Sequence, residues 1–102
     1  MPVRRVAIDA RAGKEMRHAL RWYMGQNPTA AQRFQTAVDD VVQKVGGAAE
    51  QGVLYRHRFR WIRLHKFPYL VYYEIRDPQP VLIYALAHAH RRPGYWLRRT
   101  RP

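Results

Sequence analysis

The stretch "RFRWIRLHKFPYLVYYEI", residues 58–75, decides the fold because its apolar residues recur with the period of a β-strand. A period of two places neighbouring side chains on opposite faces of a sheet. Ile62 and Leu64 suit the core, and the alternating set suits a solvent or ligand face: Trp61, Arg63 and His65. The second half, "YLVYYEI", is rich in strand formers. Residues 67–69, "FPY", are typical of a hairpin corner, so the stretch predicts two paired strands.

A helix is expected before this sheet, from Arg11 to about Gln26. Its apolar residues recur at helical spacing: Ala12, Met16, Ala19, Leu20 and Tyr23. Asp9 is a suitable N-cap for it. Residues 3–8 before the cap predict a short strand.

A second helix has the clearest pattern in the chain. Asn27 as cap with Pro28 at the first helical position is a good start, and a capping box of Thr29 with Gln32 is the alternative. One stripe of the helix is apolar: Ala31, Phe34, Val38, Val41 and Val45. Gly46-Gly47 ends it. The short link between the two helices predicts an antiparallel hairpin.

The rest of the chain completes an α+β fold in the order β-α-α-β-β-β. Residues 48–57 are expected to be a loop, "RDPQP" (76–80) a turn, and "VLIYALAHA" (81–89) a buried strand. The N-terminal strand and helix hairpin then pack on one face of a small, mostly antiparallel sheet. The other face is expected to stay open and to carry much of the positive charge. We expect one domain over 1–102, with a basic tail at about 97–102.

The composition restricts the function classes. The 102 residues include no cysteine, which excludes disulfides, thiolate metal sites and a cysteine nucleophile. No run approaches the roughly 18 apolar residues of a membrane helix, and the N-terminus has no apolar run of signal-peptide length. We therefore expect a cytoplasmic protein without membrane partners.

The net charge is +12 and is uneven along the chain. The first 51 residues hold 8 Lys and Arg against 5 Asp and Glu, whereas the last 51 hold 11 against 2. So basic a half-domain favours a polyanion or an acidic protein as partner.

The segment "HAHRRPGYW", residues 88–96, has three interpretations. Two histidines at strand spacing, expected on one face with Tyr84 and Leu86, suggest a metal site, but no third ligand stands at a recognisable spacing. We therefore expect no metal and no cofactor. As acid–base groups, His88 or His90 would move a proton beside Arg91, with Tyr95 stacking a base or donating a hydrogen bond. These are parts of a metal-free ribonuclease.

The third interpretation of this segment is structural. Pro93, Tyr95 and Trp96 would hold the chain end against the sheet, because Tyr and Trp bury a large apolar area. Three arginines would then form a solvated tail: Arg98, Arg99 and Arg101.

The ordered set of motifs resembles the RelE/ParE superfamily of type II toxin–antitoxin toxins, closest to the ParE-like plasmid stabilisation branch. The matching pieces are "ALRWY", "AAQRF", "RWIRLHKFPYLVYYEI" and "LAHAHRRPGYW". The resemblance implies a cytoplasmic toxin neutralised by an antitoxin, usually through an acidic amphipathic helix that folds on binding. It also leaves room for a homodimer or a larger toxin–antitoxin assembly.

The two branches of the superfamily imply different targets. RelE-like members cleave mRNA on the ribosome, and Arg63, Arg91 and Tyr95 match part of that catalytic set. In this chain Tyr69 stands where that set has a sheet arginine, and Trp61 stands where it has a lysine. His65, His88 and His90 would have to supply the chemistry of those two missing residues. ParE-like members lack the set and are associated with inhibition of DNA gyrase.

We therefore expect a ParE-like toxin acting on a macromolecule such as gyrase. The alternatives are a ribosome-dependent endonuclease using Arg63, His88, His90, Arg91 and Tyr95, and a non-catalytic basic nucleic-acid-binding domain. Target or partner contacts are expected at Arg58, Arg60, Trp61, His65, Arg92 and Trp96.

Overall fold

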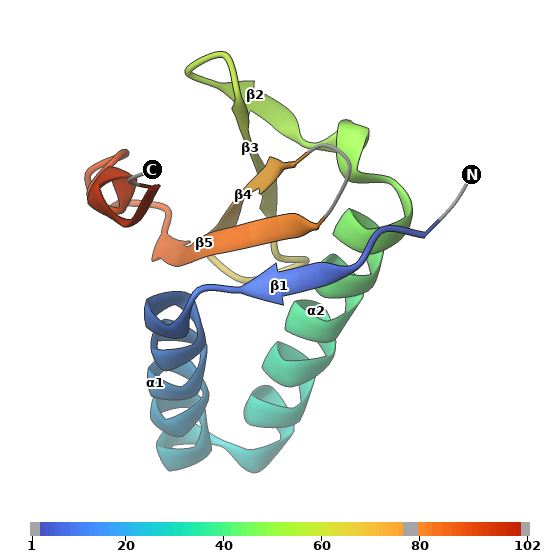
Figure 1. The fold of residues 1–102 in the computed structure, drawn as a ribbon. Helices are drawn as coiled ribbons and strands as arrows, with labels where there is room; N and C mark the ends of the chain where they lie inside the picture. Colours follow the sequence, from blue (N-terminus) through green and yellow to red (C-terminus); the bar gives the residue numbers. More distant parts are fainter. Residues whose placement is uncertain (1–2, 77–79, 101–102) are drawn as a thin grey trace.

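The chain forms a five-stranded mixed sheet with two helices on one side, in a computed structural model that describes residues 3–76 and 80–100 (Figure 1). The elements follow in the order β1 (Val6–Ile8), α1 (Ala10–Gln26), α2 (Pro28–Gly47), η1 (Ala49–Gln51), β2 (Val53–Tyr55), β3 (Phe59–Arg63), β4 (Tyr69–Ile75), β5 (Val81–His88) and η2 (Leu97–Thr100). The strand order is β1-β5-β4-β3-β2. Among the described strands, β1 pairs in parallel with β5 and the other pairs are antiparallel, so the predicted α+β class and mostly antiparallel sheet are confirmed.

The two helices start where the sequence predicts. The Asp9 carboxylate accepts from the Arg11 N–H at 2.8 Å, and Asn27 Oδ1 accepts from the N–H groups of Thr29 and Ala30. Asn27, with Pro28 after it, is therefore the cap, rather than Thr29 in a capping box. Because the link is this short, α1 and α2 pack as a hairpin.

The main core lies between the helix hairpin and the sheet. The predicted stripe of α2 is buried, from Ala31 through Val45. It packs on Leu64, Val71 and Tyr73 of the sheet. The Phe34 ring also contacts Tyr23 and Phe67, with ring centres 5.1 and 5.4 Å apart, so one aromatic cluster joins both helices to the β3–β4 corner.

The predicted loop at 48–57 is wrong in part, because it contains η1 and the edge strand β2. Val53 pairs with Trp61, and Tyr55 with Phe59. The strand has only three residues, and Val53 and Leu54 are both exposed. It therefore has no alternation that the sequence could reveal.

The sheet face away from the helices is not open, which corrects the sequence prediction. A second core forms there from Phe59, Tyr72, Tyr84, Ala85, Ala87 and Trp96. The chain crosses this face after β5, and the Trp96 ring is 0% exposed. It lies nearly parallel to the Tyr84 ring, with centres 5.7 Å apart. Burying so large a ring stabilises the chain end against the sheet.

A β-bulge in β5 changes which side chains share a face. Tyr72 pairs with Ala85 but Tyr73 pairs with Ile83, so Tyr84 is the extra residue. Ile83 and Leu86 therefore both face the helices, while Tyr84 joins the second core. The expectation that Tyr84 shares a face with Leu86 is wrong for this reason.

The turn predicted for "RDPQP" lies partly outside the described residues, at 77–79. On either side of that gap, the Arg76 N–H donates to the Pro80 carbonyl at 3.0 Å. Across the described ranges, no helix is both long and apolar enough to cross a membrane.

Candidate functional site

The candidate site lies along the C-terminal half of β5, which the shorter strand β1 does not cover. β1 pairs with β5 only from Val81 to Ile83, after which the Asp9 N–H donates to the Ile83 carbonyl and the chain turns into α1. Within the described part of the chain, residues 84–88 of β5 therefore have no strand beside them on this edge. Exposed backbone groups of this kind need other partners.

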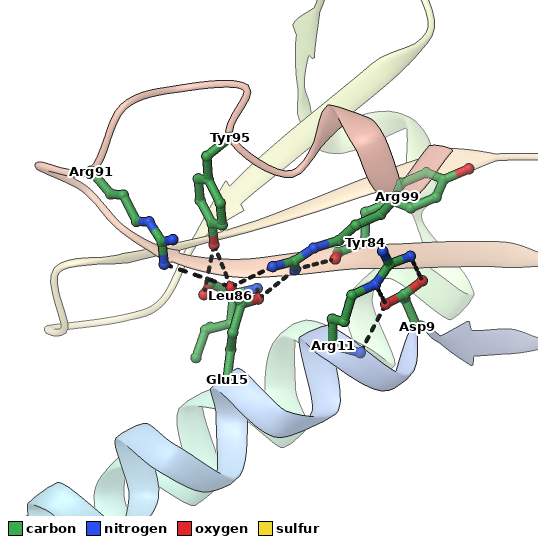
Figure 2. Close-up of polar contacts among 8 residues, drawn as sticks. All are labelled: Asp9, Arg11, Glu15, Tyr84, Leu86, Arg91, Tyr95 and Arg99. Atoms are coloured by element: carbon green, nitrogen blue, oxygen red, sulfur yellow. Dashed lines mark hydrogen bonds and ion pairs between the residues drawn. The ribbon is translucent and has the colours of Figure 1, made fainter. Parts of the chain in front are cut away.

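Side chains take the place of the missing strand (Figure 2). Glu15 of α1 accepts from the Leu86 backbone N–H at 3.1 Å. Arg99 of η2 donates to the Tyr84 backbone carbonyl at 3.0 Å. The two side chains also bind each other, with Arg99 Nη1 2.8 Å from Glu15 Oε1 and Nη2 3.0 Å from Oε2.

Tyr95 and Arg91 complete the Glu15 cluster. The Tyr95 hydroxyl donates to Glu15 Oε2 at 2.6 Å. The Arg91 guanidinium lies 3.6 Å from the centre of the Tyr95 ring, a cation–π contact, and 3.9 Å from the same carboxylate oxygen. One carboxylate thus holds three residues of the C-terminal segment against α1.

The surroundings of this cluster keep the Tyr95 hydroxyl protonated and the Arg99 guanidinium charged. Burial, followed by the hydrogen bond to the Glu15 carboxylate, raises the pKa of Tyr95 well above its ordinary value. The hydrogen bond to Glu15 likewise raises the pKa of Arg99. Since the Glu15 and Arg99 side chains are only 18% and 13% exposed, water screens this pair less than a surface pair.

The basic tail predicted at about 97–102 is corrected over its described part. Residues 97–100 form η2, and Arg99 is bound inside the cluster rather than solvated. Arg98 is exposed, as expected for a tail residue. Arg101 lies outside the described residues.

Of the candidate nuclease residues, Arg63 lies apart from the other four, which gather around the end of β5. Arg63 pairs with Leu70 of the second core, whereas His88 pairs with Tyr69 of the main core, so the sheet separates Arg63 from His88. His90 lies in the turn after β5, beside His88, with ring centres 5.3 Å apart. The Tyr95 hydroxyl is occupied by Glu15 and its raised pKa opposes ionisation.

The predicted contact residues are spread over the molecule. Arg58 forms an ion pair with Glu74 at 3.1 Å, and Arg60 donates to the carbonyls of Glu50 and Gly52. Both arginines therefore have structural partners. His65 and Arg92 are exposed, and Trp61 is half-buried against the second core. Trp96 is fully buried, so it serves packing, as the structural interpretation predicted, and does not present its ring to a partner.

A groove of about 360 Å³ lies between α1 and the end of β5, and we call it the α1–β5 groove. It is lined by Arg11, Lys14, Glu15, His18, Ala19, Arg21, Tyr69, Leu86, His88, Arg91 and Arg99. The sequence analysis missed its α1 wall. The available signal was the helical spacing of Arg11, Lys14, His18 and Arg21 around a single acidic residue.

The comparison with protein families gives one match, to the model described as "ParE toxin of type II toxin-antitoxin system, parDE", over residues 6–93. The chain belongs to this family. A comparison with curated proteins finds no match. Family membership makes the chain the toxin of a toxin–antitoxin module and gives it a cognate antitoxin as partner. The predicted superfamily resemblance and its ParE-like branch are confirmed.

The family match ends before the C-terminal partners of Glu15. It includes Glu15 and Arg91 but stops at residue 93, before Tyr95 and Arg99. The contacts of Tyr95 and Arg99 that anchor the C-terminal segment therefore come from the structure of this chain and not from the family match.

Replacing Glu15 by Gln should lower the free energy of unfolding by about 1.5–3 kcal/mol, the usual contribution of hydrogen bonds to charged groups. The substitution leaves the half-buried Arg99 without its counter-charge. Urea denaturation at neutral pH measures the effect. The matched control is Glu50→Gln, because Glu50 forms an exposed pair with Arg4 at 3.6 Å and should contribute less than about 1 kcal/mol. Equal losses in the two variants would contradict this role of Glu15.

Proposed function

We propose that this ParE-family toxin acts in the cytoplasm by binding DNA gyrase, without cleaving RNA, and that an acidic antitoxin neutralises it. The observation that carries the proposal is the separation of Arg63 from the other candidate reacting groups. Arg63 lies across the sheet from His88, and the Tyr95 hydroxyl keeps its proton and donates a hydrogen bond to the internal carboxylate of Glu15. A general acid–base mechanism needs such groups within reach of one substrate atom.

The charge distribution supports binding as the mode of action. Among residues 3–76 and 80–100, the acidic side chains used in ion pairs are Asp9, Glu15, Glu50 and Glu74. Many cations remain exposed, among them Lys14, Arg17 and Arg21 of α1. A surface of one sign steers an oppositely charged partner and speeds its association.

An exposed apolar side chain on α1 supports an amphipathic antitoxin segment as the neutralising element. Met24 is 59% exposed. It lines a cavity of about 310 Å³ whose lining is mostly apolar: Leu20, Met24, Pro28, Ala31, Gln32 and Gln35. Arg17 and Arg21 stand about two turns and one turn before Met24 on the same helix. An apolar anchor near cations matches an acidic amphipathic helix.

A supercoiling assay with purified gyrase tests the target. We expect the folded toxin to inhibit supercoiling, and the Glu74→Gln variant, which changes a structural pair far from the α1–β5 groove, to inhibit it equally if it stays folded. Absence of inhibition by the folded protein would refute gyrase as target. Cuts at fixed codon positions in mRNA, mapped by primer extension after induction, would favour the ribonuclease alternative instead.

A growth assay tests the antitoxin proposal. Induced toxin should arrest growth, and co-expression of its cognate antitoxin should restore it. The Met24→Ser variant should still arrest growth but resist rescue, because the exposed apolar anchor beside the cavity is lost. Full rescue of the Met24→Ser variant would show that the antitoxin binds elsewhere.

A further inference from the structure

The α1–β5 groove carries a stripe of cationic and histidine side chains along one wall. Arg11, Lys14, His18 and Arg21 follow each other three, four and three residues apart, which places them on one side of α1. The stripe is about 15 Å long at the helical rise per residue. The groove therefore presents an extended row of positive groups rather than one point charge.

The acidic groups near the groove do not cancel this charge. Glu15 is already bound by Arg99, Tyr95 and the Leu86 N–H, and Asp9 is bound by Arg11. Within residues 3–76 and 80–100, no ion pair engages Lys14 or Arg21. Both are exposed, so their charges are available to an anion.

The opposite wall of the groove supplies rings and further positive charge. Tyr69 and His88 meet edge to face, with ring centres 5.4 Å apart, and both line the groove. Arg91 stands beyond them, held over the Tyr95 ring. Leu86 and Ala19 add apolar surface to the lining. A row of cations opposite accessible rings is the arrangement with which proteins bind single-stranded nucleic acid.

We propose that the α1–β5 groove binds a short segment of single-stranded DNA, with Lys14, Arg21 and Arg91 at phosphates and a base against the Tyr69–His88 pair. The choice of DNA rests on the proposed function, because the proposed target works on DNA. The groove is a recess between a helix and a strand, whereas duplex readers place a protruding helix or ribbon in the major groove. Its volume of about 360 Å³ lies in the range of small-ligand sites, which suits a nucleotide unit.

Fluorescence anisotropy with a labelled oligothymidine tests the proposal on the whole chain without gyrase. The double variant Lys14→Ser, Arg21→Ser should bind more weakly. Its plot of log affinity against log salt should be shallower by about 1.4, since each lost phosphate contact on a single strand removes about 0.7. The matched control is Arg33→Ser, Lys44→Ser, which removes the same charge from exposed positions of α2. The control should keep the wild-type slope.

The ring contribution is tested with His88→Ala, because His88 is exposed whereas Tyr69 also packs on the aromatic cluster of the core. We expect a severalfold loss of affinity, with circular dichroism unchanged. Equal slope changes in the groove and control double variants would mean diffuse attraction and would overturn the site. Tighter binding of the matching RNA, or of an acidic peptide, at Lys14 and Arg21 would overturn DNA as the occupant.

The outcomes separate this site from the proposed target. Groove-dependent DNA binding without inhibition of supercoiling supports the site and refutes gyrase as target. Inhibition of supercoiling by a toxin that does not bind DNA refutes the site and leaves the gyrase proposal standing.

Discussion

The carboxylate of Glu15 stands at the uncovered edge of β5, and the arrangement of the functional surface depends on it. It accepts the Leu86 N–H, which would otherwise be a strand group without a partner, together with the Tyr95 hydroxyl and both terminal nitrogens of Arg99. Arg99 in turn donates to the Tyr84 carbonyl. Satisfied in this way, the edge is closed to pairing with another strand. The same contacts hold the C-terminal segment in place.

Two further features act with Glu15 to position the groove. The bulge at Tyr84 reverses the alternation of β5, so Leu86 and His88 face α1 while Tyr84 supports Trp96 on the other side. Trp96 then holds the segment across the sheet, with its ring 0% exposed. Arg91, which precedes Trp96 in this segment, lies on the α1 side of the sheet, near Glu15. The buried Trp96 ring on one face of the sheet and the Glu15 carboxylate at its edge thus fix the position of Arg91, a cation that a target would contact.

The sequence predicted the parts of the fold that have strong local signals. The stripe of α2 and the caps Asp9 and Asn27 follow from spacing and side-chain chemistry, and the packing of Ile62 and Leu64 follows from alternation. Other features depend on contacts distant in sequence. β2 is too short for a pattern, the bulge changes the parity within an apolar run, and Glu15 meets partners 71 to 84 residues away. For the same reason Arg63 looked like a partner of His88, although the sheet lies between them.

Hydrogen exchange at the Leu86 amide tests the role of Glu15 most directly. Leu86 lies on an edge that no strand among the described residues covers, so its protection depends on the carboxylate at 3.1 Å. The amide of His88, two residues on, points to the same edge and is the internal control. The account predicts slow exchange at Leu86, fast exchange at His88, and faster exchange at Leu86 when Glu15 is replaced by Ala. Exchange at Leu86 as fast as at His88 in the unaltered chain would contradict it.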